Sequence, residues 1–198
     1  LELDKTLLEA VGSALRPKGL INYANISTLT ASTTGANGDT FQPEDVAKSI
    51  GTVESVNARF KSWVMRPLMW SGIVNRRADA VVAGDAKGQF VFNILRELGT
   101  NFDVDRDSVG NLYGYPVYKS TQVSKARAKG SATNLTYILG GDFSDYVIAM
   151  SGVMEFQMNT QATEAFTQDQ TWLRSITMCD GAPLREASFI LLDTLIEG

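Results

Sequence analysis

The residue types that most often carry out catalysis are scarce in this chain. Its 198 residues include no histidine, and histidine is the commonest general base and metal ligand. Cys179 is the single cysteine, and without a histidine it lacks the base that usually activates a thiol nucleophile. We therefore expect Cys179 to be a buried or half-buried strand residue, and we predict that the protein is not an enzyme.

Two loops resemble ion-binding motifs but lack the positions on which binding depends. Residues 103–107 (DVDRD) match the start of a calcium loop, yet Ser108 and Gly114 stand where that loop needs glycine and a bidentate glutamate. Residues 35–40 (GANGDT) resemble a phosphate-binding loop, but no strand is indicated before them and no Lys-Ser/Thr pair follows. We therefore predict solvated loops, no metal site and no cofactor.

The charge pattern argues against binding of nucleic acid through a basic surface. The net charge is −4 and the pI is about 4.9, whereas such surfaces need clustered lysine and arginine. Lys125, Arg127 and Lys129 form a small basic run, but no aromatic residue interleaves with it to stack on bases. We expect residues 119–131 to be a solvated loop, or to contact an acidic surface of a neighbouring subunit.

The chain shows no sign of export or of membrane insertion. No apolar stretch approaches the roughly twenty residues of a membrane-spanning helix, and no secretory signal is visible at the start. A single cysteine cannot form a disulfide within the chain. We therefore predict no membrane association, and a reducing, cytoplasmic site of assembly.

Helices are indicated in the first part of the chain. Residues 1–12 carry apolar residues at helical spacing, and Gly12 is a suitable stop. The sequence begins inside this pattern without a methionine, so we expect an upstream part to be missing. Pro43 with the two acidic residues after it favours a helix start, and the apolar stripe that follows continues to Phe60.

Strands are indicated mainly in the second part. We expect a surface loop at 25–39, a helical turn or two at 68–74, and strands at 63–65, 113–118 and 136–139. Asp180-Gly181 predicts a turn, and the apolar run 189–192 predicts a strand covered on both faces. Mixed helices and strands, with strands dominating the last third, predict an α+β fold.

Two further segments alternate at a period of two. Met154, Phe156 and Met158 alternate with polar residues, which is typical of a half-buried strand. Residues 172–178 alternate again, with Trp172 and every second residue after it on one side. We expect these segments to be strands that build a surface.

Four short segments form an ordered set along the chain. They are residues 16–20 (RPKGL), 63–67 (WVMRP), 112–117 (LYGYPV) and 141–144 (GDFS). In order and spacing this set resembles the C-terminal portion of the major capsid protein of tailed bacteriophages, which has the Hong Kong 97 fold. Arg66 departs from the asparagine that is more usual in the second segment.

The resemblance implies two lobes. An axial lobe with a mixed sheet and flanking helices would comprise residues 13–145 and 183–198. Part of a peripheral lobe with long strands would comprise residues 1–12 and 146–182. The N-terminal arm, the extended loop and most of the spine helix would belong to the missing upstream part.

The resemblance also implies where subunits would meet. The polar loop 160–170 would contact neighbouring subunits around three-fold axes, although an ordinary hairpin tip is the alternative. Its candidate contact residues are Glu164, Phe166, Asp169 and Gln170. The loop has no obvious asparagine where the family's type member forms a covalent cross-link, so such a link is not supported.

The function implied by the resemblance is structural. The protein would self-assemble into pentamers and hexamers of an icosahedral shell, the virion capsid, and would enclose double-stranded DNA without sequence-specific binding. A scaffold, a portal and a maturation protease would be further partners. Two alternatives stay open: an encapsulin-type compartment shell, and a small-ligand or carbohydrate-binding module, suggested by Trp63, Trp70 and Trp172.

Overall fold

The computed structural model describes residues 2–13, 16–76, 108–152, 155–159 and 171–197. Its helices are α1 (Glu2–Glu9), α2 (Pro43–Ser55) and α3 (Pro67–Asn75), with short 3-10 turns η1 (Leu20–Asn22), η2 (Phe143–Asp145) and η3 (Glu186–Ser188). Its strands are β1 (Ser27–Leu29), β2 (Ser62–Met65), β3 (Ser108–Leu112), β4 (Tyr115–Lys119), β5 (Arg127–Lys129), β6 (Ala132–Gly141), β7 (Tyr146–Met150), β8 (Glu155–Asn159), β9 (Trp172–Ile176), β10 (Cys179–Pro183) and β11 (Phe189–Leu195).

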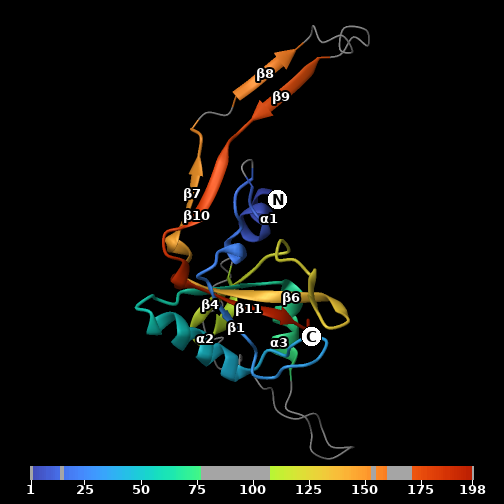
Figure 1. Cartoon of the computed structure of the whole chain (residues 1–198), viewed down its shortest axis with the longest axis vertical. Coiled ribbons are helices and arrows are strands. Elements are labelled where there is room, and N and C mark those ends of the chain that lie inside the picture. Colours follow the sequence, from blue (N-terminus) through green and yellow to red (C-terminus); the bar gives the residue numbers. More distant parts are fainter. Residues whose placement is uncertain (1, 14–15, 77–107, 153–154, 160–170, 198) are drawn as a thin grey trace, which may run out of the picture.

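Seven of these described strands form one mixed sheet. Their order is β1-β11-β6-β2-β4-β3, and β5 pairs with the start of β6. The β1–β11 and β2–β4 pairs are parallel and the other pairs are antiparallel. We call this sheet, together with α2 and α3, the body (Figure 1). The predicted α+β class with a mixed sheet is confirmed.

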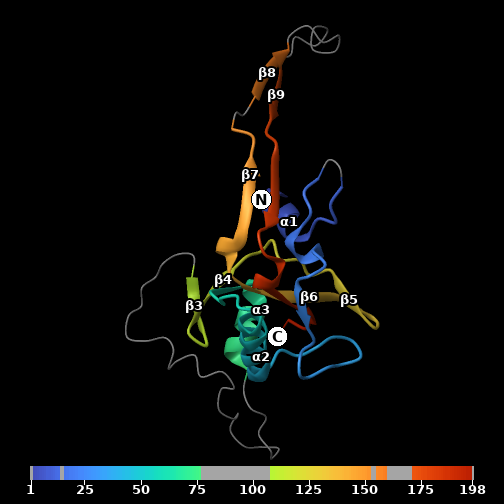
Figure 2. The ribbon, with the colours of Figure 1, turned by 60° about the vertical axis from the view of Figure 1, so that its left-hand side comes forward.

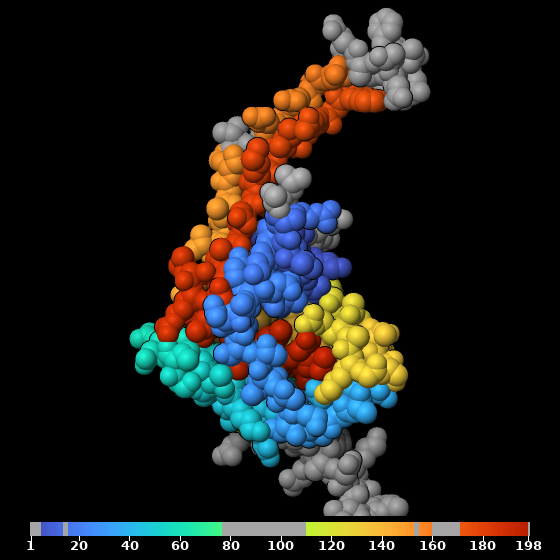
Figure 3. All heavy atoms as spheres, viewed as in Figure 1, coloured from blue at the N-terminus to red at the C-terminus, as the bar shows by residue number. Residues whose placement is uncertain are grey.

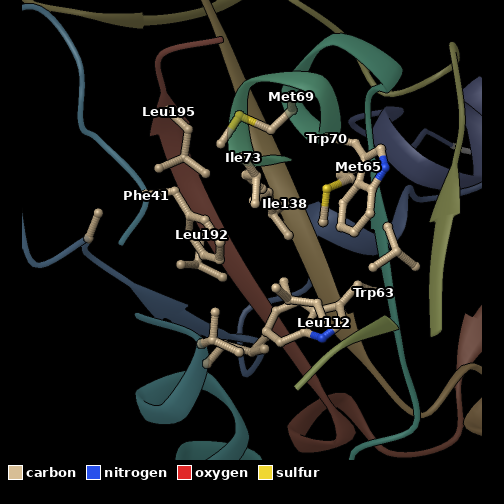
Figure 4. Packing of buried hydrophobic residues seen from close by; sticks show 14 of the residues in the cluster. Phe41, Trp63, Met65, Met69, Trp70, Ile73, Leu112, Ile138, Leu192 and Leu195 are labelled. Carbon is tan, nitrogen blue, oxygen red and sulfur yellow. The ribbon is translucent and has the colours of Figure 1, made fainter. Parts of the chain in front are cut away.

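One face of the sheet packs against α2 and α3. Trp63 and Met65 of β2 and Ile138 of β6 meet Met69 and Ile73 of α3 in a buried apolar cluster (Figure 4). Each of these five side chains is at most 1% exposed. Burial of large apolar side chains is the dominant favourable contribution to folding, so this cluster is the main source of the body's stability.

The opposite face of the sheet carries a second buried cluster. It consists of Leu20, Ile26, Val123, Tyr137, Leu139, Phe189 and Leu191. Successive residues of β11 therefore enter different clusters, with Phe189 and Leu191 in this one and Ile190 and Leu192 in the first. The prediction that 189–192 is a strand covered on both faces is confirmed.

The start of α2 is held by a buried carboxylate. Pro43 is the first helical residue, and the Asp45 carboxylate accepts a hydrogen bond from the Gln42 N–H at 2.8 Å. It also accepts bonds from the N–H and hydroxyl of Ser32, at 2.7 and 2.6 Å. The carboxylate satisfies the N–H of Gln42, the residue just before the helix, and ties the helix start to Ser32, so the helix begins where the sequence predicts.

The helix ends earlier than its apolar stripe suggests. It stops at Ser55, and Asn57 has a φ of 58°, a left-handed conformation that ends the helical path. Phe60 is buried, but it lies in the connection between α2 and β2 rather than on the helix. The apolar spacing indicated burial correctly and helix length incorrectly.

Three other predicted segments differ from the structure. The expected loop 25–39 contains β1, which extends the sheet beside β11. The expected strand 113–118 begins only at Tyr115, because Tyr113 and Gly114 have positive φ values and form the turn after β3. The first helix ends at Glu9 rather than near Gly12. The strands at 63–65 and 136–139 and the helix over 68–74 are confirmed.

The remaining strand pairs, β7–β10 and β8–β9, lead away from the body as a narrow ribbon (Figure 2). Figure 3 shows that this ribbon projects well beyond the body, and that α1 lies beside its base. The division of the chain into two lobes at residues 12/13, 145/146 and 182/183 stays a prediction. Within the described residues, no helix is both long and apolar enough to cross a membrane.

Candidate assembly surface

The outer part of the ribbon has one apolar face. In the β8–β9 pair, Phe156 stands opposite Ser175 and Met158 stands opposite Leu173. Directly opposed residues of an antiparallel pair project to the same side. Phe156, Met158 and Leu173 therefore share a face, which we call the apolar face of the ribbon. Trp172 and Arg174 lie on the other face, as their spacing predicts.

This apolar face lies open. Phe156 is 64% exposed, Met158 is 73% exposed and Leu173 is 67% exposed. The prediction of strands is confirmed for residues 155–158 and 172–176, and Met154 lies outside the described residues. The expected half-burial is wrong for the part that the structure describes. A period of two shows which residues share a face, and a neighbour has to be present before that face is buried.

The inner part of the ribbon is anchored at its base by α1. The Tyr146 hydroxyl donates to the Leu7 carbonyl at 3.4 Å, and the Tyr23 hydroxyl donates to the Gly181 carbonyl at 3.2 Å. A Cβ atom on Gly181 would lie 2.4 Å from the Tyr146 oxygen, so only glycine permits this approach. Burial raises the pKa of Tyr146 to about 12, with the hydroxyl of Tyr23 as a further cause.

The predicted turn at Asp180-Gly181 is wrong. Both residues belong to β10, where Gly181 pairs with Ile148 of β7. On the same pair, Ile148 is 50% exposed, and Met150, further out, is 61% exposed. Apolar exposure therefore begins on the inner part of the ribbon and continues along it to the outer part.

The contact residues predicted from the sequence lie outside the described part of the chain. Glu164, Phe166, Asp169 and Gln170 fall outside the described residues, and so does the calcium-like stretch 103–107. Cys179 is half-buried on β10, as predicted. Among the described residues there is no cluster of three or more aspartate, glutamate or cysteine side chains that could hold a metal ion.

The basic run is not a solvated loop, and this part of the prediction is wrong. Its three cations pair with carboxylates of the same chain: Lys125 with Glu197, Arg127 with Asp193, and Lys129 with Asp39. Residues 127–129 form β5. An acidic surface of a neighbouring subunit is therefore not needed to balance these charges.

Asp39 is the polar residue that sequence reasoning missed. It lies in the phosphate-like loop and is only 1% exposed. Burial alone would raise its pKa, but hydrogen bonds from the Lys129 ammonium, the Gly35 N–H and the Thr194 hydroxyl outweigh burial and lower the pKa below the ordinary 3.8. The carboxylate thus fastens the loop to β5 and to the end of β11, which is a structural task. The sequence signal that could have pointed to Asp39 is the alternation of cations at 125, 127 and 129, because each of them pairs with a carboxylate of the same chain.

Two of the three tryptophans cannot form a ligand platform. Trp63 on β2 is fully buried and Trp70 on α3 is 8% exposed, and both belong to the first core cluster. Trp172 is 46% exposed, on the face of the ribbon opposite Leu173. A carbohydrate-binding surface built from all three is therefore wrong.

Comparison with known proteins places the chain in a family. The model of the phage capsid family matches residues 1–194. The chain belongs to the phage capsid family. The resemblance seen in the four sequence segments is confirmed, and this family is structural rather than enzymatic. Among curated proteins, none matches this capsid-family chain.

Solved structures share the fold of this capsid-family chain at low sequence identity. The capsid of a native GTA particle has a TM-score of 0.65 and 16% identity, and the match covers 98% of this chain and 61% of that one. The structure from Mycobacterium phage Ogopogo has a TM-score of 0.58 and 14% identity, and the match covers 96% of this chain and 62% of that one. The holo-SrpI encapsulin complex from Synechococcus elongatus PCC 7942 has a TM-score of 0.56 and 13% identity, and the match covers 98% of this chain and 60% of that one. The chain thus spans about three-fifths of the length of these structures.

Proposed function

We propose that this chain is the C-terminal portion of a major capsid protein that assembles with copies of itself into pentamers and hexamers of an icosahedral shell. The shell would be the virion capsid and would enclose double-stranded DNA. Family membership over residues 1–194 supports the proposal. The net charge of −4 fits a wall that contains DNA without binding its sequence.

The observation that carries this proposal is the open apolar face of the ribbon. A strand pair standing alone is at best marginally stable in water, because it has no core to bury its side chains in. Here Phe156, Met158 and Leu173 are each more than 60% exposed. Contiguous exposed apolar surface marks interaction sites in soluble proteins. The partner that a shell supplies is another copy of the same chain.

The edges of the ribbon support the same conclusion. Each strand of the β8–β9 pair has a single strand partner among the described residues, so its outer edge presents backbone N–H and C=O groups. Such edges pair readily with further strands or loops. A neighbouring subunit that covers the apolar face would also satisfy this edge. The loop 160–170, with Glu164 and Asp169, would extend this contact.

Electron microscopy of the full-length protein that contains this chain tests the proposal. Leu173→Gln replaces an apolar side chain on the open face, and Gln157→Ser changes the opposite face of the same strand pair. We expect parent-like shells with Gln157→Ser and unassembled subunits with Leu173→Gln, at unchanged melting temperatures. Shells of normal yield with both Leu173→Gln and Met158→Gln would contradict the role of this face.

An encapsulin-type compartment is the second candidate, because the encapsulin match has the same fold and similar coverage. The two candidates differ in their contents. Purified shells would hold double-stranded DNA in a virion, and a folded protein cargo in a compartment. Nuclease-protected DNA in the particles would support the capsid, and a stoichiometric second protein would support the compartment.

We further propose a scaffold, a portal and a maturation protease as partners of the capsid.

A further inference from the structure

The base of the ribbon is connected to the body by two short crossings. The outgoing crossing, residues 141–145, links β6 to β7, and the return crossing, residues 184–188, links β10 to β11. The crossings are joined to each other by backbone bonds. The Leu184 N–H donates to the Asp145 carbonyl at 2.7 Å, and the Asp142 N–H donates to the Ser188 carbonyl at 3.2 Å.

An apolar contact packs the outgoing crossing against the body. The rings of Phe143 and Phe189 meet edge to face, with centroids 5.5 Å apart. Apolar contacts have little directional preference, so they hold two surfaces together while tolerating changes in angle. This contact can therefore serve as a pivot for the ribbon.

The connection between α2 and β2, residues 56–61, binds the outgoing crossing through an ion pair and hydrogen bonds. The Lys61 ammonium lies 2.8 Å from the Asp142 carboxylate and donates to the Ser144 hydroxyl at 2.9 Å. The Lys61 N–H also donates to the Gly141 carbonyl at 3.3 Å. Hydrogen bonds are directional, so these contacts fix the angle of the crossing as well as its position.

The same connection also binds the return crossing through hydrogen bonds. The Arg185 guanidinium donates to the Asn57 carbonyl at 2.9 Å and to the Val56 carbonyl. These carbonyls follow the C-terminal end of α2, whose last turn has no basic residue of its own. A cation is favoured at a helix C-terminus, so Arg185 supplies from a distant segment what the helix lacks.

We propose that residues 56–61 form a two-point collar that sets the inclination of the ribbon relative to the body. Lys61 holds one crossing, Arg185 fastens the other, and Phe143 on the first crossing is the pivot. When either contact is released, the ribbon swings about the pivot while the body stays folded, and it swings further when both are released. The collar is a conformational device within one chain, and it operates whether or not the protein forms a shell.

Pulsed electron spin resonance tests the collar by measuring a distance across it. Spin labels are placed at Ala149→Cys on β7, which directly follows the outgoing crossing, and at Glu54→Cys on α2, in a Cys179→Ser background. The labelled protein is diluted with unlabelled protein, so that pairs within one chain dominate. We expect one narrow distance distribution for this parent, and a broader, displaced distribution for Lys61→Met and for Arg185→Gln.

Matched variants make the outcome decisive. Lys61→Arg keeps the charge near Asp142 and should retain the narrow distribution, as should Lys48→Met on α2, which lies away from the crossings. Melting curves establish that each variant is folded. If Lys61→Met fails to fold, Arg185→Gln carries the test, because Arg185 is exposed. A parent-like distribution in folded Arg185→Gln would overturn the proposal, and so would a parent-like distribution in a folded Arg185→Gln, Lys61→Met double variant.

Discussion

Arg127 on β5 and Asp193 at the end of β11 form a two-pronged ion pair across 66 residues of sequence. The Arg127 Nε donates to Asp193 Oδ1 at 2.7 Å, and its Nη2 donates to Oδ2. Asp193 lies in an irregularity of β11 beside Thr194, whose φ is 56°. Such a conformation is strained for a β-branched residue, so the surrounding contacts must hold it.

We expect Arg127→Met to lower the free energy of unfolding by about 1.5–3 kcal/mol, the usual range for a hydrogen bond to a charged group. Chemical denaturation measures the change. A double-mutant cycle with Asp193→Asn should show that the two losses are not additive, because they remove one interaction. Lys119→Met on β4, an exposed lysine, is the control and should change little. Additive losses would show that the pair is not coupled.

Two tryptophans should respond differently to the same substitution. Trp63→Ala removes a fully buried ring from the core, and we expect a loss of about 3–5 kcal/mol in unfolding free energy. Trp172 is 46% exposed on the ribbon, so Trp172→Ala should leave the melting temperature nearly unchanged. Under the proposed function, it should instead impair assembly. A large drop in melting temperature for Trp172→Ala would show that this ring is part of a core.

Acid should destabilise the body through two carboxylates. Burial would raise the pKa of Asp142, but bonds from Lys61 and Ser144 lower it below the ordinary 3.8, as similar bonds do for Asp39. A group with a lowered folded pKa contributes its full stability above the unfolded pKa. That contribution is lost as the pH falls through the folded pKa.

Melting temperatures measured from near-neutral to strongly acidic pH check this expectation. The parent should lose stability once the pH falls below about 4, where unfolded aspartates take up protons. Asp39→Asn and Asp142→Asn should each be less stable at neutral pH and lose less on acidification. Glu54→Gln, on the exposed surface of α2, should follow the parent curve. Parallel curves for all four proteins would contradict the assignment.

Two glycines should respond in opposite directions to alanine. Gly141 has a φ of 141°, and a Cβ there would lie 2.2 Å from the Ser188 carbonyl oxygen. Gly141→Ala should therefore cost about 1–3 kcal/mol through backbone strain, and more through the collision. Gly51 lies inside α2 with open space around it, so Gly51→Ala should stabilise by about 0.5–1 kcal/mol. Thermal melts compare the two variants, and equal effects would contradict both assignments.

The sequence alone determined the elements whose signals are local. Pro43 and the acidic residues after it mark the start of α2, because they act on N–H groups within one turn. The run 189–192 predicts a strand buried on both faces, because no alternation is left for a solvated side. The ordered segments from 16–20 to 141–144 indicated the family correctly. The first two inferences depend on residues that are close together in the chain, and the third depends on the order of four short segments along it.

Only the tertiary structure decided which surfaces find partners. Phe156 and Met158 alternate as a half-buried strand would, yet within this chain they face solvent. Lys125, Arg127 and Lys129 look like a solvated loop, yet each meets a carboxylate brought to it by folding. Asp180-Gly181 looks like a turn, yet it extends β10 beside β7. Burial and charge pairing depend on what lies across a face, and residues distant in sequence supply that neighbour.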